Sequence, residues 1–206
     1  MKNAKALICI DIQNDFCPGG ALAVAQGDDI IPLVNQMMHT AKSDGQAVIL
    51  TQDWHPDNHA SFADNHENAQ PFDMVEMSYG GQVLWPKHCV QGSQGAAFHD
   101  MLHSDSADLV IRKGFRKEID SYSAFFENDQ STPTGLHGYL QERGITKLTM
   151  VGLATDFCVA FSALDGAKLG YDVSVDLAAC RAIDLDGSLA AQLDAMRTAG
   201  ISLINQ

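Results

Sequence analysis

Short apolar runs alternate with amphipathic segments along most of the chain. Residues 47–53, AVILTQD, have the length of a buried strand, whereas residues 30–45 carry apolar side chains at helical spacing between an early proline and a final glycine. The pattern predicts strands at residues 6–11, 47–53, 108–114, 147–154, 171–176 and 201–204, and helices at residues 30–45, 135–144, 156–170 and 187–200. Strands separated by helices are typical of a mostly parallel sheet with helices on both faces. The predicted fold is therefore α/β, with three layers in the order α, β, α.

Residues 54–108 interrupt this alternation. The stretch is rich in His, Asn, Gly and Pro and contains no convincing strand, and a loop of this length in a compact domain is usually functional or disordered. Both tryptophans of the chain and several histidines lie here, which argues against disorder. Because no repeat, low-complexity tract or linker marks a boundary, we expect residues 1–206 to form one domain whose long loop serves a site.

Composition and charge narrow the class of protein. A chain of 206 residues with 46% hydrophobic and 19% charged residues is typical of one globular domain. The formal net charge of −13, without any basic run, argues against nucleic-acid binding. The first apolar run, ALICI, is too short for a signal-peptide core or a membrane span. The five cysteines are odd in number and scattered, which predicts no disulfide framework and a reducing, cytoplasmic location.

Four residues with charged or reactive side chains follow predicted strands. Asp11, Asp53 and Lys113 come at the ends of three strands, and Cys158 follows a fourth, near the start of a helix. Because the carboxyl ends of parallel strands carry the ligand site, we expect these side chains to meet at one edge of the sheet. The positive end of a helix shifts a thiol toward thiolate, and a carboxylate beside a cation can take the thiol proton.

Each of these residues also has an ordinary structural interpretation. Asp11 can cap the turn after its strand, although Asp15 is the better candidate for such a cap. Lys113 can extend to solvent from an apolar strand, and Cys158 can serve packing alone. The remaining cysteines are expected to be structural: Cys9, Cys17, Cys89 and Cys180.

The tripeptide Asp53-Trp54-His55 indicates a metal site. In an extended chain the carboxylate and the imidazole fall on the same side, as two ligands of one divalent ion would. Alone this is a weak signal, which a surface Asp–His pair would also give. A third donor, His88, lies in the same long loop beside an aromatic residue and strengthens it. Zinc, iron and manganese all accept one carboxylate with two imidazoles, so the pattern does not choose among them.

Other polar residues of the long loop are weaker candidates for metal binding. His59 stays a candidate for a fourth ligand. His66 and Glu67 are better explained as residues of a solvated polar loop.

Six stretches occur in order between about residues 6 and 180. They are CIDIQNDFCPGGAL, TQDWHPDNHASF, LWPKHCVQGSQGA, VIRKGF, DSYSAF and VGLATDFCV. Together they resemble the successive motifs of the nicotinamidase family, within the isochorismatase-like hydrolase superfamily. Six motifs in the same order are a far stronger signal than any one of them. The resemblance implies the isochorismatase-like form of the predicted α/β fold.

For the reacting groups, the resemblance implies roles residue by residue. Cys158 would be the nucleophile, Asp11 the carboxylate that transfers protons, and Lys113 the third member of the triad. Lys113 would keep Asp11 ionised in the resting enzyme. The backbone N–H groups of Ala154 and Cys158 would stabilise an oxyanion.

The resemblance also implies a substrate pocket and a metal ion. Phe16 and Trp85 would line the substrate ring, together with Leu153 and Ala154, whose shared peptide bond is cis in relatives. One divalent ion, Zn, Fe or Mn, would hold the pyridine nitrogen, with waters completing its coordination. Its protein ligands would be Asp53, His55 and His88.

The implied activity is that of a metal-dependent cysteine amidohydrolase. It would convert nicotinamide to nicotinate and ammonia through a thioester, in NAD salvage, and would also accept pyrazinamide. Isochorismatases and carbamoyl-amide hydrolases share the fold but generally lack the histidines of DWH and PKHC, which favour a nicotinamidase here. An alternative from another class is a non-catalytic metal-binding or redox protein, which would need neither Asp11 nor Lys113. The expected partner is a small-molecule substrate, with no nucleic acid or membrane, and a homo-oligomer is left open.

Overall fold

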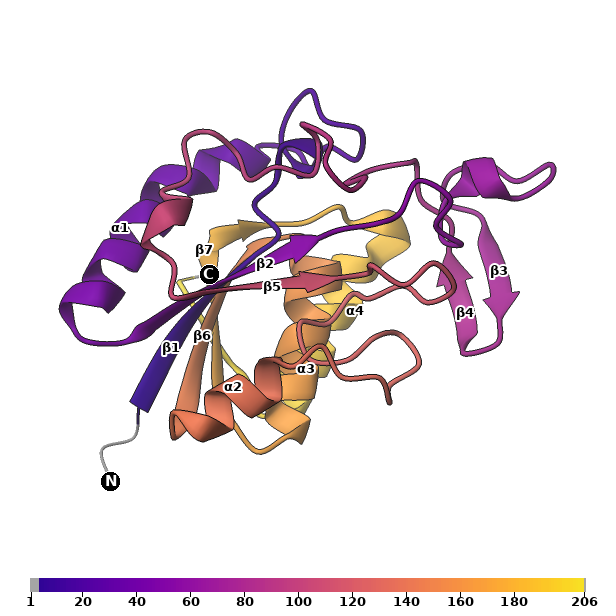
Figure 1. Ribbon diagram of the computed structural model, residues 1–206. Coiled ribbons are helices and arrows are strands. Elements are labelled where there is room, and N and C mark those ends of the chain that lie inside the picture. Colours follow the sequence, from indigo (N-terminus) through magenta and orange to yellow (C-terminus); the bar gives the residue numbers. More distant parts are fainter. Residues whose placement is uncertain (1–3, 206) are drawn as a thin grey trace.

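The computed structural model describes residues 4–205 and is built on one six-stranded sheet (Figure 1). Its strand order is β5-β2-β1-β6-β7-β8, and each neighbouring pair is parallel. The strands are β1 (Ala4–Ile10), β2 (Ala47–Asp53), β5 (Leu109–Lys113), β6 (Ile145–Leu153), β7 (Asp172–Arg181) and β8 (Ser202–Ile204). The prediction of a mostly parallel central sheet is confirmed, and each predicted strand is present. The expected domain limits, residues 1 and 206, lie outside the described residues.

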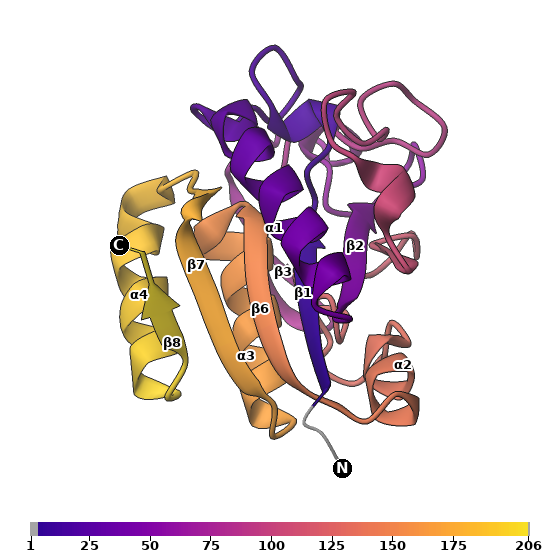
Figure 2. The same cartoon turned by 90° about the vertical axis from the view of Figure 1, so that its left-hand side faces the viewer.

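Helices cover both faces of this sheet, as the alternating pattern predicted. Helix α1 (Ile31–Ser43) lies on one face, and α2 (Leu136–Glu142), α3 (Ala160–Lys168) and α4 (Ser188–Thr198) lie on the other (Figures 1 and 2). Within residues 4–205, no helix combines the length and apolar character needed to cross a bilayer. The three-layer α/β/α architecture is therefore confirmed.

Two hydrophobic clusters hold the layers together, and strand alternation divides them. In β1, Leu7 and Cys9 belong to the cluster under α1, whereas Ile8 and Ile10 belong to the cluster on the opposite face. Helix α1 contributes buried side chains at helical spacing, Val34, Met38 and Ala41. All four β1 side chains are at most 3% exposed, so β1 is a central strand buried on both faces.

The long loop contains two strands that the sequence pattern did not predict. Strands β3 (Met74–Met77) and β4 (Gly80–Val83) pair antiparallel as a separate hairpin, visible beside the sheet in Figure 1. The expectation of a strand-free stretch at residues 54–108 was therefore wrong. These strands are four residues long, and β4 begins with two glycines, so neither length nor β-propensity marks them in the sequence.

The helix predicted at residues 156–170 also begins differently. Its first turn, Thr155–Val159, has π-helical hydrogen bonding, and regular α-helix starts at Ala160. Cys158 therefore lies in a widened turn between β6 and α3. Such π turns are frequent at functional sites.

The strand order explains why chemistry gathers at one edge of the sheet. Lys113 at the end of β5 is the register partner of Asp53 at the end of β2, and β1 runs beside β2 and leads into Asp11. Strand β6 lies on the other side of β1 and leads into the turn that carries Cys158. Four adjacent parallel strands therefore bring together residues that are up to 147 positions apart in the sequence.

Strands β1 and β6 can approach as they do because position 152 is a glycine. A Cβ atom there would lie 2.1 Å from the carbonyl oxygen of Ile10, and the φ angle of Gly152 is +122°. Both features exclude larger residues. Since Ile10 precedes Asp11 and Gly152 precedes Leu153, this contact sets the spacing between two strand ends.

We predict that Gly152→Ala lowers the free energy of unfolding by on the order of 3 kcal/mol, because it combines a backbone clash with an unfavourable φ angle. Urea denaturation followed by circular dichroism measures the change. The matched control is Gly170→Ala, whose φ angle is +90° but whose Cβ would meet open space. It should cost about 1 kcal/mol, and equal losses for the two variants would contradict the close-approach explanation.

Candidate active site

A fully buried lysine lies at the centre of the site. The Nζ atom of Lys113 lies 2.8 Å from Oδ2 of Asp11 and 2.5 Å from Oδ1 of Asp53, and it donates to the carbonyl of Ser121 at 2.9 Å. It also lies 3.4 Å from Sγ of Cys158. The two carboxylates and the thiol together raise the pKa of Lys113 well above its usual value, against the effect of burial. Lys113 is thus a cation that joins all three groups, and it does not extend to solvent.

Asp11 lies just beyond β1 with no solvent exposure. Thr51 holds it in place, because the Thr51 hydroxyl donates to Oδ1 at 2.6 Å and accepts the Asp11 N–H at 3.2 Å. Oδ2 faces the Lys113 ammonium, but among the described residues it has no partner with hydrogen-bond geometry. Burial raises the pKa of Asp11, and the charge of Lys113 opposes this shift without outweighing it. Lys113 therefore favours the ionised form of Asp11, as expected, although burial makes this carboxylate a stronger base than an exposed one.

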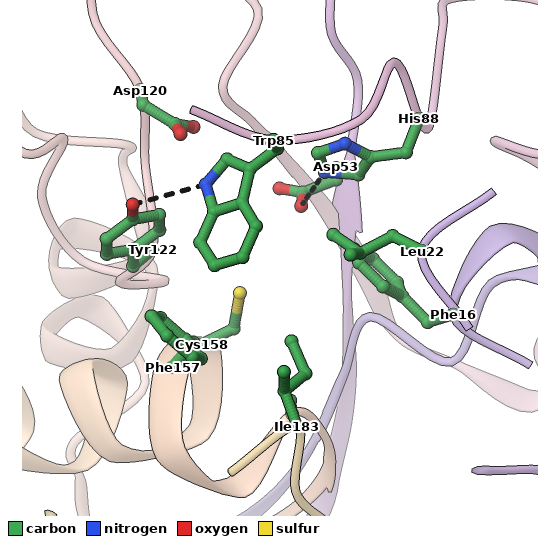
Figure 3. A pocket seen from close by; sticks show the side chains of 11 residues that line it. Phe16, Leu22, Asp53, Trp85, His88, Asp120, Tyr122, Phe157, Cys158 and Ile183 are labelled. Carbon is green, nitrogen blue, oxygen red and sulfur yellow. Dashed lines mark hydrogen bonds and ion pairs between the residues drawn. The ribbon is translucent and has the colours of Figure 1, made fainter. Parts of the chain in front are cut away.

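Cys158 is 7% exposed and points its sulfur into a pocket, as Figure 3 shows. Its Sγ and carboxylate oxygens of Asp11 and Asp53 all lie within 4.8 Å of one another. Burial raises the pKa of Cys158 well above its ordinary value, with Lys113 acting in the opposite direction. The expected shift of this sulfur toward thiolate is therefore reversed, because burial together with Asp11 and Asp53 outweighs the effect of Lys113.

Gln13 and Asp15 hold the backbone around the site, and the sequence analysis had given a role only to Asp15. The side chain of Gln13 bonds both backbone groups of Asp53, accepting from its N–H at 2.8 Å and donating to its carbonyl at 2.9 Å. Asp15, predicted to cap a turn, accepts from the N–H of Ala21 at 3.2 Å and also from that of Cys89 at 2.7 Å. Gln13 and Asp15 follow Asp11 so closely that the motif itself was the available signal.

Asp53, His55 and His88 form a compact donor set. Oδ2 of Asp53 lies 3.6 Å from Nε2 of His55 and 4.0 Å from Nε2 of His88. Nδ1 of His55 bonds the carbonyl of Gly114 at 2.8 Å, and Nδ1 of His88 bonds that of Pro86 at 2.8 Å. A carbonyl can only accept, so each Nδ1 carries a hydrogen and the two Nε2 atoms face Asp53. Against the effect of burial, Asp53 raises the pKa of His55, so a metal ion bound there would replace the proton on Nε2.

This donor set fits a divalent metal ion. Ligands of one such ion stand roughly 3.0–3.5 Å apart when each is about 2.1 Å from it, close to the separations found here. Burial and the nearby His55 lower the pKa of His88 to about 4, so this imidazole is neutral, as a metal ligand must be. The pKa of Asp53 is also lowered, because Lys113 and His55 outweigh its burial.

Gly114 lies directly against one of these imidazoles. A Cβ atom at position 114 would lie 2.4 Å from Cε1 of His55, and the φ angle of Gly114 is +61°. Because the same residue supplies the carbonyl that orients His55, it fixes both the position and the tautomer of the ring.

His59 is fully buried beside His55, with ring centroids 4.5 Å apart. Its Nδ1 accepts from the N–H of Ser61 at 3.2 Å, and its Nε2 bonds the carbonyl of Ile119 at 3.3 Å. Both nitrogens therefore have protein partners, although His55, His59 and Asp120 form a second group of possible donors within 4.8 Å. To act as a fourth ligand, His59 would have to give up the Ile119 carbonyl.

The other two polar loop residues lie differently. His66 bonds the carbonyl of Ala60 at 2.6 Å and is half-buried, which departs from the expected solvated residue. Glu67 is exposed, as expected.

An apolar pocket opens above Cys158 (Figure 3). Aromatic rings form two of its walls: Trp85 stacks edge-on against Phe157 at 5.0 Å, and Phe16 stacks edge-on against His88 at 5.4 Å. The lining consists of Phe16, Leu22, Asp53, Trp85, His88, Asp120, Tyr122, Ala154, Phe157, Cys158 and Ile183. Its aromatic walls suit a flat ring, with the sulfur of Cys158 and two of the candidate metal ligands, Asp53 and His88, in the same lining.

Leu153 and Ala154, both expected at the substrate site, differ in their relation to the pocket. The peptide bond between Leu153 and Ala154 is cis, as the resemblance implied, and Ala154 lines the pocket. The side chain of Leu153 instead packs in the cluster under α1, so its expected contact with substrate is not part of this pocket. The carbonyl of Ala154 accepts from the N–H groups of Phe157 and Val159, on either side of Cys158.

Several pocket residues received no role from the sequence. Asp120 and Tyr122 belong to the DSYSAF stretch, which was noted only as a motif. Leu22 and Phe157 lie in the first and last of the six quoted stretches, and Ile183 lies outside all of them. Nothing in their residue types distinguishes them from core residues, so only their placement identifies them.

Comparison with known proteins agrees with this geometry. The model of the Isochorismatase domain family matches residues 5–206. A nicotinamidase from Acinetobacter baylyi is 52% identical over 100% of this chain and 95% of its own length. The structure of a nicotinamidase/pyrazinamidase from Acinetobacter baumannii superposes with a TM-score of 0.95 at 53% identity, covering 99% of this chain and 97% of that chain.

A more distant structure adds a metal. It is the pyrazinamidase of Pyrococcus horikoshii in complex with zinc, with a TM-score of 0.79 and 33% identity over 98% of this chain and 99% of that chain. Similarity over the full length at these identities indicates a shared family in addition to a shared fold. The chain therefore belongs to the nicotinamidase family of isochorismatase-domain hydrolases.

Proposed function

We propose that this protein hydrolyses nicotinamide to nicotinate and ammonia, and that it also accepts pyrazinamide. The observation that carries the proposal is the buried group of Lys113, Asp11 and Cys158 beneath an aromatic pocket with metal donors on one side. The names of the two Acinetobacter relatives support the same substrates. A metal-dependent cysteine amidohydrolase requires each of these parts.

The first half-reaction forms a thioester. The thiol proton of Cys158 passes to Asp11 while the sulfur attacks the carboxamide carbon, and the carbonyl oxygen takes up the electron pair. The N–H groups of Ala154 and Cys158 are proposed to stabilise that oxyanion. Asp11 then gives the proton to the amide nitrogen, the C–N bond breaks, and ammonia leaves.

The second half-reaction releases the acid. A water molecule gives one proton to Asp11 as its oxygen attacks the thioester carbon. The C–S bond then breaks, and the sulfur of Cys158 takes the proton back from Asp11. The product dissociates as nicotinate, and the enzyme returns to its starting state.

The pKa shifts of Asp11 and Cys158 suit these proton transfers. Burial raises the pKa of both Asp11 and Cys158, so the resting thiol is neutral and the carboxylate is a stronger base than an exposed one. The raised pKa also keeps protonated Asp11 available for the leaving nitrogen. Lys113 contacts both groups and holds their orientation.

We propose Asp53, His55 and His88 as the ligands of one divalent ion, and zinc as its first candidate. The support is their donor geometry and the zinc complex of the Pyrococcus horikoshii relative. When bound, the ion supplies a Lewis-acidic centre that orients the pyridine nitrogen of the substrate. Phe16 and Trp85 then hold the ring from its sides.

We also propose a setting for this activity. The match over residues 5–206 and the single central sheet support one catalytic domain spanning the chain. The five cysteines are all free, which supports a reducing, cytoplasmic compartment. Nicotinate as product supports a role in NAD salvage, and assembly into a homo-oligomer stays a prediction.

Purified protein is expected to release ammonia from nicotinamide, and Cys158→Ala to lower this rate by about a thousandfold or more, because the nucleophile is lost. Coupled detection of ammonia measures both. Chelation should silence the wild type, and added Zn²⁺, Fe²⁺ or Mn²⁺ should restore it. The matched control, Cys180→Ala, removes a buried thiol outside the pocket and should stay active. A wild type that stays inactive with all three metals would contradict the nicotinamidase assignment.

Lys113→Ala tests the ammonium separately from the metal. We expect amidase activity to fall by about a hundredfold or more while zinc content is retained, because all three metal ligands remain. The uncompensated carboxylates should also lower the free energy of unfolding by about 3–5 kcal/mol. Ammonia release, zinc analysis by mass spectrometry and urea denaturation supply the three readouts.

Lys87→Ala is the control, since Lys87 pairs with Asp57 at the surface of the same long loop. It should leave all three readouts unchanged. Full amidase activity in Lys113→Ala would contradict the proposed role of Lys113, whereas zinc binding without ammonia release in both the wild type and the variant would favour the non-catalytic metal-binding alternative.

Gly114→Ala is expected to weaken zinc binding by about tenfold or more, because the added methyl displaces the His55 ring and the carbonyl that orients it. Calorimetric titration of metal-free protein with Zn²⁺ measures this without reference to activity. Gly92→Ala is the control, since its φ angle is also positive, at +76°, but its Cβ meets open space. Equal zinc affinities in the two variants would remove His55 from the proposed ligand set.

A further inference from the structure

A buried carboxylate that the mechanism does not use lies two residues before the nucleophile. Asp156 is 1% exposed and belongs to the π-helical turn Thr155–Val159. Its Oδ1 accepts from the N–H of Ile183 at 3.0 Å, and its Oδ2 accepts from the N–H of Asp184 at 2.7 Å and from the hydroxyl of Ser188. Two of these bonds reach the connection between β7 and α4, and the third reaches Ser188, the first residue of α4.

That connection forms a wall of the substrate pocket. Ile183 lines the pocket, and in Figure 3 its side chain points toward the same space as the sulfur of Cys158. The residues that follow are conformationally costly, because Asp184 and Asp186 have positive φ angles of 55° and 51°. A segment in such a conformation persists only where its surroundings hold it, and Asp156 bonds its backbone directly.

We propose that Asp156 is a positioning residue that holds the Ile183 wall at a set distance from Cys158 and thereby determines how tightly the pocket grips a flat heteroaromatic ring. This inference rests on the proposed amidase function of the pocket. Asp156 and Cys158 lie in the same short turn, so the hydrogen bonds of Asp156 fix the position of the Ile183 wall relative to Cys158. Bonds to a carboxylate are the stronger kind of hydrogen bond, which suits a fixed spacing.

The expected consequence is a loss of binding that is the same in the ground state and the transition state. Asp156→Asn keeps the size of the side chain but turns an amide NH₂ toward backbone N–H groups, so at least one bond to the wall is lost. The KM for nicotinamide should rise by about tenfold, as loss of a charge-assisted bond predicts, while kcat changes by less than about twofold.

Asp176→Asn is the matched control for a merely structural role. Asp176 is a buried carboxylate on β7 that also accepts two hydrogen bonds, from the N–H of Ala178 at 3.2 Å and the side chain of Asn205 at 2.8 Å. None of these residues lines the pocket. This variant should lose stability but keep the wild-type KM.

A double-mutant cycle tests whether Asp156 acts through the wall. If it does, Asp156→Asn should add little to the KM of Ile183→Ala, because the side chain that Asp156 positions is already gone. Should Asp156→Asn fold poorly, Ser188→Ala removes one partner only and should raise KM in the same direction by a smaller factor.

Alkylation of Cys158 gives a readout that does not depend on amide hydrolysis. Peptide mass spectrometry follows its modification by iodoacetamide, a small reagent, and by N-phenylmaleimide, a bulky one. Asp156→Asn should raise the rate with the bulky reagent relative to the small one, and Asp176→Asn should not. If the wild type hydrolyses no amide, the proposed function fails, and this ratio still decides the role of Asp156.

The inference is overturned by any of three results. They are a KM shift in Asp156→Asn no larger than in Asp176→Asn, full additivity in the double-mutant cycle, and an unchanged ratio of alkylation rates.

Discussion

The buried ammonium of Lys113 is the interaction on which the rest of the site depends. A charge with no solvent exposure needs partners inside the protein, and Lys113 has them in Asp11 and Asp53. Asp53 uses one oxygen for this ion pair and turns the other toward His55 and His88. The carboxylate of Asp53 therefore contacts both the proposed triad, through Lys113, and the proposed metal site.

Charge balance around this ammonium accounts for the protonation of Cys158, the proposed nucleophile. Two carboxylates face one lysine, so negative charge is in excess and a thiolate at Cys158 would add to it. Burial and these carboxylates keep the thiol neutral in the resting site. The same excess of negative charge favours the binding of a cation beside His55 and His88. In the proposed mechanism the thiolate forms only as the thiol proton moves to Asp11, so the resting site holds no reactive sulfur.

The long loop reaches the pocket through its hairpin. Gln82 on β4 is 1% exposed, and its amide donates to Asp120 at 3.0 Å and to the hydroxyl of Tyr122 at 2.8 Å. That hydroxyl in turn accepts from the indole N–H of Trp85 at 3.2 Å. Ring orientations in the pocket are thus set by a buried polar network that spans the loop and the segment after β5. Such networks give a site one defined geometry.

The sequence by itself determined the fold class, the succession of the six sheet strands and four helices along the chain, and the residues that carry charge or a thiol at strand ends. These follow from local periodicity and from the rule that parallel strands end at one edge. The pairing of Asp53 with His55 as proposed metal ligands could be predicted for the same reason, because alternation in an extended chain is a local property.

Only the tertiary structure decided which groups touch and what their pKa values become. The pKa of Cys158 is raised by burial and by the carboxylates of Asp11 and Asp53. Neither carboxylate is close to Cys158 in the sequence. The β3–β4 hairpin was also found only in the folded structure. The hydrogen bond from the N–H of Ile183 to Asp156 likewise joins segments that are distant in the sequence. Local pattern determines what a segment can become, whereas desolvation and Coulomb energy depend on distances that exist only once the chain has folded.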